Sequence, residues 1–237
     1  MRDINRVLFD RCRIAGGALA LAGLLCCFSA SAADLKWAGT TWQVRSGGGR
    51  PCASGHWNAQ GAWVDADGWL HLKLAPDAQG RFECVEVKSV ERFGFGHYEF
   101  DVQGPVGSID PNVVLGIFMY PPPEVGPDGT NEIDIEVSRW GRADAPQINY
   151  TVWNRTRAGK RHTNLAIANG IRQARCGFTW QPERVSWESP LHPGPVAFAG
   201  DIADQPQHLI LNLWLYRETA PSDGREVEFM VKWRERQ

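Results

Sequence analysis

The chain has 237 residues, a length typical of one sizeable domain, and its 43% hydrophobic and 22% charged residues exclude an intrinsically disordered chain. The net charge of −2 provides no basic footprint for nucleic acid. Tryptophan is over-represented, with eleven copies, and in an all-β protein its rings either fill the core or form flat stacking surfaces in a binding site.

Residues 1–33 predict a cleaved export signal. Four arginines precede an apolar run over residues 14–28, and the small residues that follow fit a cleavage site after Ala32 or Ala33. The apolar run is shorter than the roughly 20 residues of a membrane span, so an uncleaved anchor is the less favoured alternative. Cleavage would remove four Arg and two Asp and leave residues 34–237 as one secreted or periplasmic domain, net charge −4, free of the membrane.

Export changes how the cysteines are interpreted, because an exported chain enters an oxidising compartment. Cys52, Cys84 and Cys176 remain after cleavage, so one of them is free if the other two pair. Cys52 and Cys84 flank two predicted strands and are the better pair. Cys176 alternates with Phe178 and Trp180, which predicts a buried thiol. The chain has no Cys-x-x-Cys or His-Glu-x-x-His motif, so no metal site is predicted.

From residue 34 onward, apolar and polar residues alternate in short runs, the period of strands that bury one face. In chain order these runs are 69–74, 98–102, 132–137, 209–216 and 227–233. Turns rich in Gly, Pro and Asp separate them, and there is no internal repeat, linker or second domain. The pattern predicts an all-β antiparallel sandwich or barrel. The Pro- and Gly-rich segment 121–129 directly precedes the third run and is expected to form the rim of a site.

The third run is acidic on one face. Alternation places Glu132, Asp134 and Glu136 together and points three apolar residues the other way. Three neighbouring carboxylates repel each other, so they are expected on a wet face or where they perform chemistry. Glycoside hydrolysis needs two carboxyls in different protonation states, and crowding raises the pKa of one of them. Taken alone, the pattern leaves a solvated strand face as an equal alternative, and without a nearby His it is a poor transition-metal site.

Several segments resemble glycoside hydrolase family 16, and within it the bacterial lichenases, which are β-1,3-1,4-glucanases. The Glu-Ile-Asp-Ile-Glu run at 132–136 looks like the catalytic strand of that family. Further matches follow in the same order at 82–89, 93–99, 118–120, 148–150, 178–182 and 211–214. The resemblance covers most of the mature chain. It implies a concanavalin A-like jelly-roll sandwich with a concave substrate cleft, and a retaining endo-acting hydrolase of β-glucans, in the first place mixed-linkage β-1,3-1,4-glucan.

The resemblance also implies roles for individual residues. Glu132 corresponds to the nucleophile, Asp134 to the assisting residue and Glu136 to the acid/base. The expected substrate-binding residues are Glu86, Lys88, Tyr120, Asn149, Asn212 and Trp214, and Trp140 joins them as a stacking residue because it closely follows the acid/base. The same match implies the disulfide Cys52–Cys84. A polysaccharide is the expected partner, and the protein is expected to be a monomer.

Some positions depart from the lichenase pattern. Thr130 replaces a stacking Trp, and Lys88 replaces an Arg, which removes a planar bidentate donor. Met230 lies near the position of a calcium-binding Asp, so no cofactor is expected, and a structural calcium stays open as an alternative that Met230 disfavours. These changes affect substrate subsites and leave the acidic triplet intact. Two alternatives stay open: a carbohydrate-binding or wall-associated protein with little hydrolysis, and a transglycosylase.

Overall fold

The computed structural model of the protein describes residues 34–52, 56–156 and 159–236. The predicted export signal lies outside these residues. The described part is built almost wholly of β-strands, in two antiparallel sheets of eight strands each. Its two 3₁₀ turns are η1 (Ala59–Gly61) and η2 (Tyr216–Glu218). No helix among the described residues is long and apolar enough to cross a membrane.

The first sheet carries the acidic run. Its strands, in spatial order, are β1 (Asp34–Trp37), β2 (Thr40–Val44), β6 (Val85–Phe93), β15 (Gln207–Leu215), β8 (Val113–Tyr120), β9 (Ile133–Ser138), β10 (Ile148–Trp153) and β11 (Lys160–Leu165). The central strands therefore come from distant parts of the chain, since β15 lies between β6 and β8.

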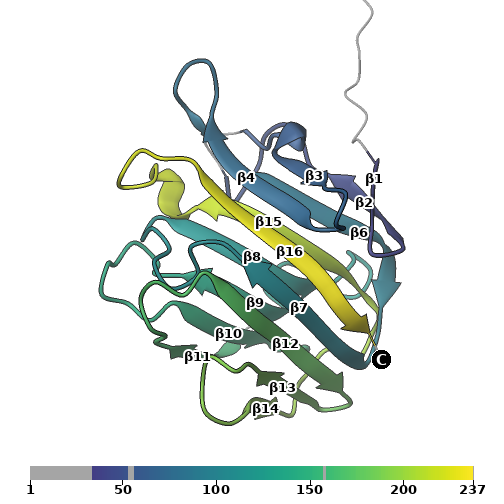
Figure 1. Cartoon of the computed structure of the whole chain (residues 1–237). Helices are drawn as coiled ribbons and strands as arrows, with labels where there is room; N and C mark the ends of the chain where they lie inside the picture. Colours follow the sequence, from purple (N-terminus) through teal and green to yellow (C-terminus); the bar gives the residue numbers. More distant parts are fainter. Residues whose placement is uncertain (1–33, 53–55, 157–158, 237) are drawn as a thin grey trace, which may run out of the picture. The chain divides into compact units, whose positions relative to one another are not determined.

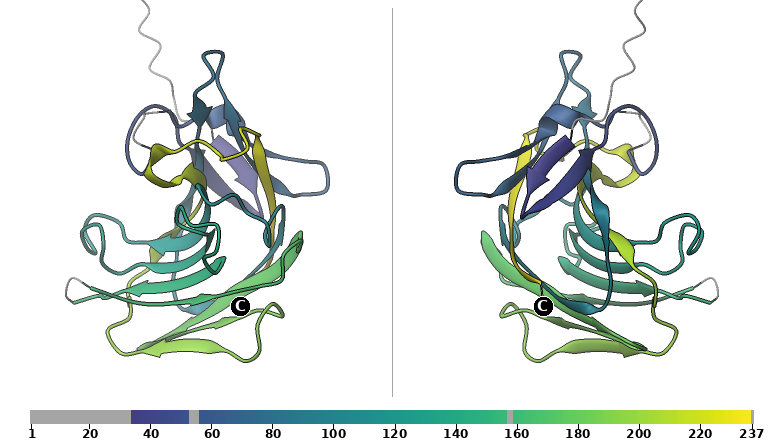
Figure 2. Two further views of the ribbon diagram at one scale, coloured as in Figure 1. Left: turned by 90° about the vertical axis from the view of Figure 1, so that its left-hand side faces the viewer. Right: turned by 90° about the vertical axis from the view of Figure 1, so that its right-hand side faces the viewer.

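The second sheet packs against the first. Its strands, in spatial order, are β14 (Val196–Ala199), β13 (Arg184–Glu188), β12 (Gln173–Gln181), β7 (Gly96–Gln103), β16 (Val227–Arg236), β4 (Leu70–Pro76) and β3 (Ala62–Val64), with the short β5 (Phe82–Glu83) paired to β4. Figures 1 and 2 show the two sheets as separate layers, with β16, β7 and β12 running side by side in the second. This arrangement confirms the predicted antiparallel sandwich.

The core lies between the layers and follows the predicted alternation. The inward residues of the central strands are buried, for example Leu70, Leu72 and Leu74 in β4, Ile133, Ile135 and Val137 in β9, and Leu209, Leu211 and Leu213 in β15. Burying such a side chain contributes about 1.5–3 kcal/mol relative to leaving it exposed. The opposite side of each strand is thereby free to carry polar residues.

The cysteines are arranged as the sequence predicts. Cys52 and Cys84 form a disulfide with a Cα–Cα distance of 6.2 Å, which ties the segment after β2 to the start of β6. Cys176 is a free, buried thiol on β12. Burial raises the pKa of the Cys176 thiol to about 12, so this group is a weak nucleophile at neutral pH.

Candidate functional site

The pairing register aligns predicted site residues on the first sheet. Glu136 of β9 lies opposite Gly116 of β8 and Asn149 of β10. Gly116 lies opposite Asn212 of β15, which in turn lies opposite Glu86 of β6. Since neighbouring strands are about 4.8 Å apart, these five residues form one row across five strands, on the side facing away from the core.

A second row lies two residues further along the strands, on the same side of the sheet. Asp134 is opposite Phe118 and Thr151, and Phe118 is opposite Ile210, which pairs with Lys88. We call the outward side of β6, β15, β8, β9 and β10 the polar face. It brings together the acidic triplet and the predicted residues Glu86, Lys88, Tyr120 and Asn212.

Glu132 lies immediately before β9 rather than inside it. Its carbonyl still accepts a hydrogen bond from the Trp153 backbone at 2.9 Å, which continues the pairing of β9 with β10. The preceding residue, Asn131, has φ = 57°, a left-handed conformation that Asn adopts more readily than most residues. Gln207 fixes this kink by donating its side-chain amide to the Asn131 carbonyl. The chain therefore turns sharply just before the first acid of the triplet.

Asp134 is almost completely withdrawn from solvent, with 3% exposure, and Glu132 and Glu136 are half-buried on either side of it. Burial raises the pKa of Glu132 to about 8; a hydrogen bond with Asp134 opposes this rise and the charge of Glu136 adds to it. Burial raises the pKa of Glu136 to about 7. Burial, followed by the charges of both glutamates, raises the pKa of Asp134 well above its usual range. The triplet therefore retains protons at neutral pH and can hold a neutral carboxyl beside an ionised one.

Trp153 contacts this triplet directly. The sequence alone did not decide whether its ring lies in the core or on a stacking surface. Its indole Nε1 donates a hydrogen bond to Asp134 Oδ2 at 3.1 Å. The ring is half-buried on β10, beside the backbone of Glu132. Thr130 offers no ring at its own position and instead donates its hydroxyl to the Pro127 carbonyl. An aromatic residue is thus next to the triplet, but it comes from the neighbouring strand.

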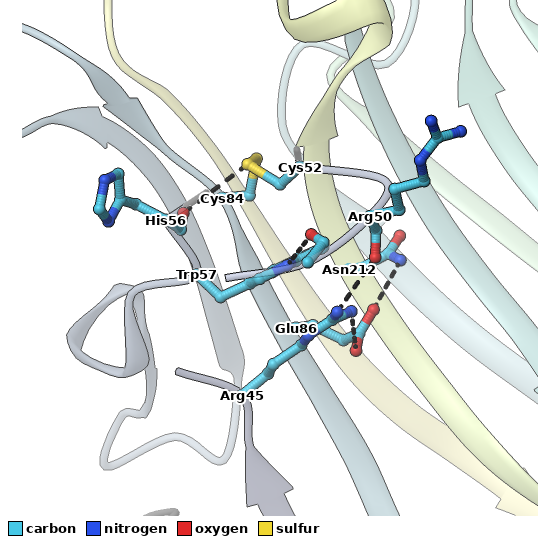
Figure 3. The surroundings of a disulfide bond; sticks show 9 residues. Arg45, Arg50, Cys52, His56, Trp57, Cys84, Glu86 and Asn212 are labelled. Carbon is cyan, nitrogen blue, oxygen red and sulfur yellow. Dashed lines mark hydrogen bonds and ion pairs between the residues drawn. A yellow bond between two sulfur atoms is a disulfide. The ribbon is translucent and has the colours of Figure 1, made fainter. Parts of the chain in front are cut away.

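Glu86 and Asn212 lie together at the β6 side of the polar face. Asn212 Nδ2 donates to Glu86 Oε2 at 3.2 Å, and Arg45 forms an ion pair with Glu86 Oε1 at 3.0 Å. Figure 3 shows the Arg45 guanidinium between Glu86 and the Arg50 carbonyl. The guanidinium carbon of Arg45 lies 4.3 Å from the centroid of the Trp57 ring. Arg45 therefore supplies a planar guanidinium close to Lys88, the position where lysine replaces the arginine of the lichenase pattern.

Sequence reasoning missed Arg45 because nothing in its local pattern points to Glu86. The two residues meet only because β2 pairs with β6 in the first sheet. The disulfide supports this region, since Trp57 forms an isolated bridge with Cys84. Trp57 also donates its indole N–H to the Gly49 carbonyl, which draws the segment before Cys52 towards the ring.

Asn149 has a different contact set from the one expected. It is completely buried, and its amide nitrogen donates to the carbonyls of Ser138 and Gln147 at 3.0 and 3.1 Å. Its side-chain oxygen accepts a hydrogen bond from Trp140 Nε1 at 3.0 Å. Protein groups thus occupy this amide, and any effect of Asn149 on a ligand would act through Trp140.

Trp140 and Trp214, two of the predicted substrate-binding residues, lie close together. Their ring centroids are 6.2 Å apart, and Tyr216 packs against Trp140 edge-on at 5.5 Å. Trp140 has φ = 52°, a conformation uncommon for a bulky residue and concentrated at functional sites. Tyr216 continues the alternation of β15 beyond Trp214. This alternation is the sequence signal that could have placed a third aromatic ring beside Trp140 and Trp214.

Tyr120 is connected to the segment predicted as a rim. Its hydroxyl donates to Asp128 Oδ1 at 3.0 Å, which ties the segment after β8 to the polar face. Burial and the charge of Asp128 raise the pKa of Tyr120 far above its usual range, so the phenol stays neutral and remains a donor.

The described residues contain no group of three or more His, Cys, Asp or Glu side chains arranged to hold a metal ion. Met230 lies on β16 opposite His71 and Gln103, and its thioether is a poor ligand for calcium, which prefers oxygen. The Met230 side chain therefore supplies no oxygen ligand for a calcium ion at this position.

Comparison with protein-family models gives no match. Among curated proteins, the chain is similar to the β-glucanase of Bacillus licheniformis, 24% identical over 159 residues, and to that of Paenibacillus macerans, 27% identical over 162 residues. Each alignment covers 67% of this chain. It spans only 62% and 64% of the two relatives, less than two thirds of their length.

Solved structures share the fold. The B. licheniformis β-glucanase has a TM-score of 0.62 at 23% identity, covering 81% of this chain and 89% of that one. A β-1,3-1,4-glucanase from a mouse hindgut metagenome has a TM-score of 0.63 at 21% identity, covering 81% and 90%. A pseudo β-1,3-glucanase of Mycobacterium tuberculosis has a TM-score of 0.59 at 16% identity, covering 81% and 88%. Together, these comparisons show that the chain is similar in sequence to bacterial β-glucanases and shares the fold of solved lichenases.

Proposed function

We propose that the protein is a retaining, endo-acting hydrolase of β-glucans, with Glu132 as nucleophile and Glu136 as acid/base. The observation that carries the proposal is the acidic triplet: three carboxyls share one face of the first sheet. Burial raises the pKa of all three, and neighbouring carboxylate charge adds to the rise for Asp134 and Glu132. A solvated strand face would leave these groups exposed and fully ionised. A buried set that retains protons suits chemistry that needs an acid and a base together.

The reaction proceeds in two displacements. In the first, the Glu132 carboxylate attacks the anomeric carbon while the bond to the leaving sugar breaks, and Glu136 gives its proton to the leaving oxygen. In the second, the Glu136 carboxylate takes a proton from water, whose oxygen attacks the anomeric carbon and releases Glu132. Asp134 holds a proton in its hydrogen bond with Glu132 before attack and stabilises the carboxylate when it is released.

The polar face supplies the contacts for a glucan. Glu86, Asn212 and Arg45 present charged and amide groups suited to sugar hydroxyls, and the rings of Trp140 and Trp214 suit the flat side of a pyranose. The relatives named β-glucanases and the solved β-1,3-1,4-glucanase favour mixed-linkage β-glucan as substrate. The disulfide Cys52–Cys84 supports secretion, the localisation that the predicted export signal implies.

Release of reducing sugar from purified protein tests the proposal. The substrates are mixed-linkage β-glucan, laminarin, xyloglucan and agarose, and Glu132→Gln is assayed beside the wild type. We expect hydrolysis of mixed-linkage β-glucan that Glu132→Gln abolishes. Hydrolysis of another glycan alone would keep the mechanism and change the substrate. Equal activity of the Gln variant would remove Glu132 from the mechanism.

Azide rescue separates the two glutamates. For Glu132→Ala we expect a glycosyl azide inverted at the anomeric carbon, because azide replaces the nucleophile on the opposite side of the sugar. For Glu136→Ala we expect a product of retained configuration, because azide then attacks the glycosyl-enzyme. The reverse assignment of products would exchange the two roles.

A glycan-binding protein without hydrolysis is the second candidate, and the pseudo β-1,3-glucanase among the structures of this fold favours considering it. This candidate predicts glycan affinity in a protein that releases no reducing sugar. A transglycosylase predicts longer products when an oligosaccharide acceptor is added, whereas hydrolysis products alone would exclude it.

A further inference from the structure

Lys160 and Trp153 form a pair at the edge of the polar face. They lie opposite each other in the pairing of β10 with β11. The Lys160 ammonium sits over the Trp153 ring, 4.7 Å from its centroid, which is favourable cation–π geometry. Gly129 approaches the same ring, and a Cβ at this glycine would lie 3.8 Å from it. The indole is therefore held between the segment before β9 and the lysine.

This pair is connected to the acidic triplet through Trp153. The indole N–H donates to Asp134, and the backbone N–H of the same residue donates to the Glu132 carbonyl. Glu132, Trp153 and Lys160 thus stand in one row across three adjacent chain segments. With about 4.8 Å between neighbours, a lysine side chain at the end of this row can reach back over the indole towards the carboxyls.

Other charged and titratable groups also face the triplet. Among the described residues they are Glu86 and Lys88 on β6, Tyr120 on β8, Asp128 in the segment after it, His208 on β15, and Lys160 and His162 on β11. Burial lowers the pKa of both His162 and His208, so neither imidazole carries a full charge at neutral pH. The positive charge of Lys160 acts on both Glu132 and Glu136 and opposes the effect of burial on their pKa values.

We propose that Lys160, held over the indole of Trp153, is a positioning residue of the catalytic pair that favours the ionised form of Glu132. The proposal rests on the proposed function, because it assigns the lysine to the same two-carboxylate chemistry. The nucleophile must be an anion in a site that burial makes unfavourable for anions. A fixed ammonium over the Trp153 ring offsets part of that cost.

Substitution of Lys160 by Met removes the charge and keeps a side chain of similar reach. We expect Lys160→Met to move both limbs of the kcat/KM pH profile upward by about 0.3–1 pH unit at low salt, the range for an exposed charge acting through partly screened space. Lys160→Arg should restore the wild-type profile. In 1 M NaCl, where the Debye length is about 3 Å, Lys160→Met and the wild type should converge.

Lys232 provides a matched control on the second sheet. Its ammonium lies 5.6 Å from the centroid of the Trp69 ring, so Lys232→Met removes the same kind of contact far from the triplet. We expect its pH profile to equal that of the wild type. An unshifted profile in Lys160→Met would overturn the proposal. A rise in KM at an unchanged profile would do so too, because it would mean that Lys160 touches the sugar instead.

A measurement without substrate separates this proposal from the proposed function. Removing the Lys160 charge raises the carboxyl pKa values further above their unfolded values, so stability should fall more steeply between pH 5 and pH 8. We expect Lys160→Met to lose roughly 1–3 °C more in Tm than the wild type over this interval, and Lys232→Met to lose no more. Parallel curves together with normal hydrolysis would refute the proposal and leave the function intact. A steeper curve without hydrolysis would refute the function alone.

Discussion

Glu136→Gln should make the folded protein more stable, and the gain should depend on pH. Burial raises the pKa of Glu136 from its ordinary value of 4.5 to about 7. A carboxyl with a raised pKa binds its proton more tightly in the folded state than in the unfolded state. Its ionisation therefore destabilises the fold progressively as pH rises from the unfolded pKa to the folded pKa. Below pH 4 the side chain is neutral in both states and this effect disappears.

The size of the effect follows from the displacement of the pKa. Each pKa unit corresponds to 1.36 kcal/mol, so the Glu136 carboxyl costs the fold up to about 3 kcal/mol at pH 8. Gln has nearly the same shape and never ionises, so it removes this cost. It also removes the Glu136 charge that raises the pKa of Glu132, which adds to the gain in the same direction. For a domain of this length, about 3 kcal/mol corresponds to a rise in Tm of roughly 6–12 °C.

Thermal unfolding at pH 4 and pH 8 measures this difference. We expect the Gln variant to unfold close to the wild type at pH 4 and well above it at pH 8. Glu188→Gln, at an exposed position on β13 of the second sheet, is the control and should leave Tm unchanged at both values. If Glu136→Gln has the same Tm as the wild type at both pH values, burial does not raise the pKa of this carboxyl as described.

Three further variants test other parts of the polar face. Gly116→Ala should lower activity and stability, by about 1–3 kcal/mol in unfolding free energy, because its Cβ would lie 2.6 Å from Asn212 Oδ1; an active, stable Ala variant would contradict the close approach. Arg45→Met should raise KM severalfold with little change in kcat, measured on the best glucan; a wild-type KM would deny Arg45 a binding role. Reduction of Cys52–Cys84 should lower Tm, since closing a loop of this separation stabilises by about 4 kcal/mol in the chain-entropy model, and an unchanged Tm would count against that contribution.

The strands and the acidic triplet were predictable because their signals are local. Alternation with a period of two assigns each residue of a strand to the core or to the outer face, whichever strands lie beside it. Leu211 and Asn212 show this directly, since one is fully buried in the core and the other belongs to the polar face. The shared face of Glu132, Asp134 and Glu136 followed from the same rule.

The supporting residues were not predictable, because their positions depend on the order of strands in the sheet. Arg45 reaches Glu86 only because β2 lies beside β6, and Lys160 reaches the triplet only because β11 lies beside β10. Neither residue stands in a motif that marks it. Asn149 shows the opposite case: its position on the sheet was predicted, but the number of protein groups that occupy its amide was not.

The buried thiol of Cys176 has a consequence for oxidative folding. In the unfolded chain Cys176 competes with Cys52 and Cys84, and any two of these three thiols can pair. Once β12 is packed, a pKa of about 12 leaves roughly one thiolate in ten thousand at pH 8, and the surrounding core keeps oxidants away from the sulfur. Native packing therefore withdraws Cys176 from thiol exchange and leaves Cys52 and Cys84 as the pair that can react, so folding of the second sheet protects the correct pairing in the first.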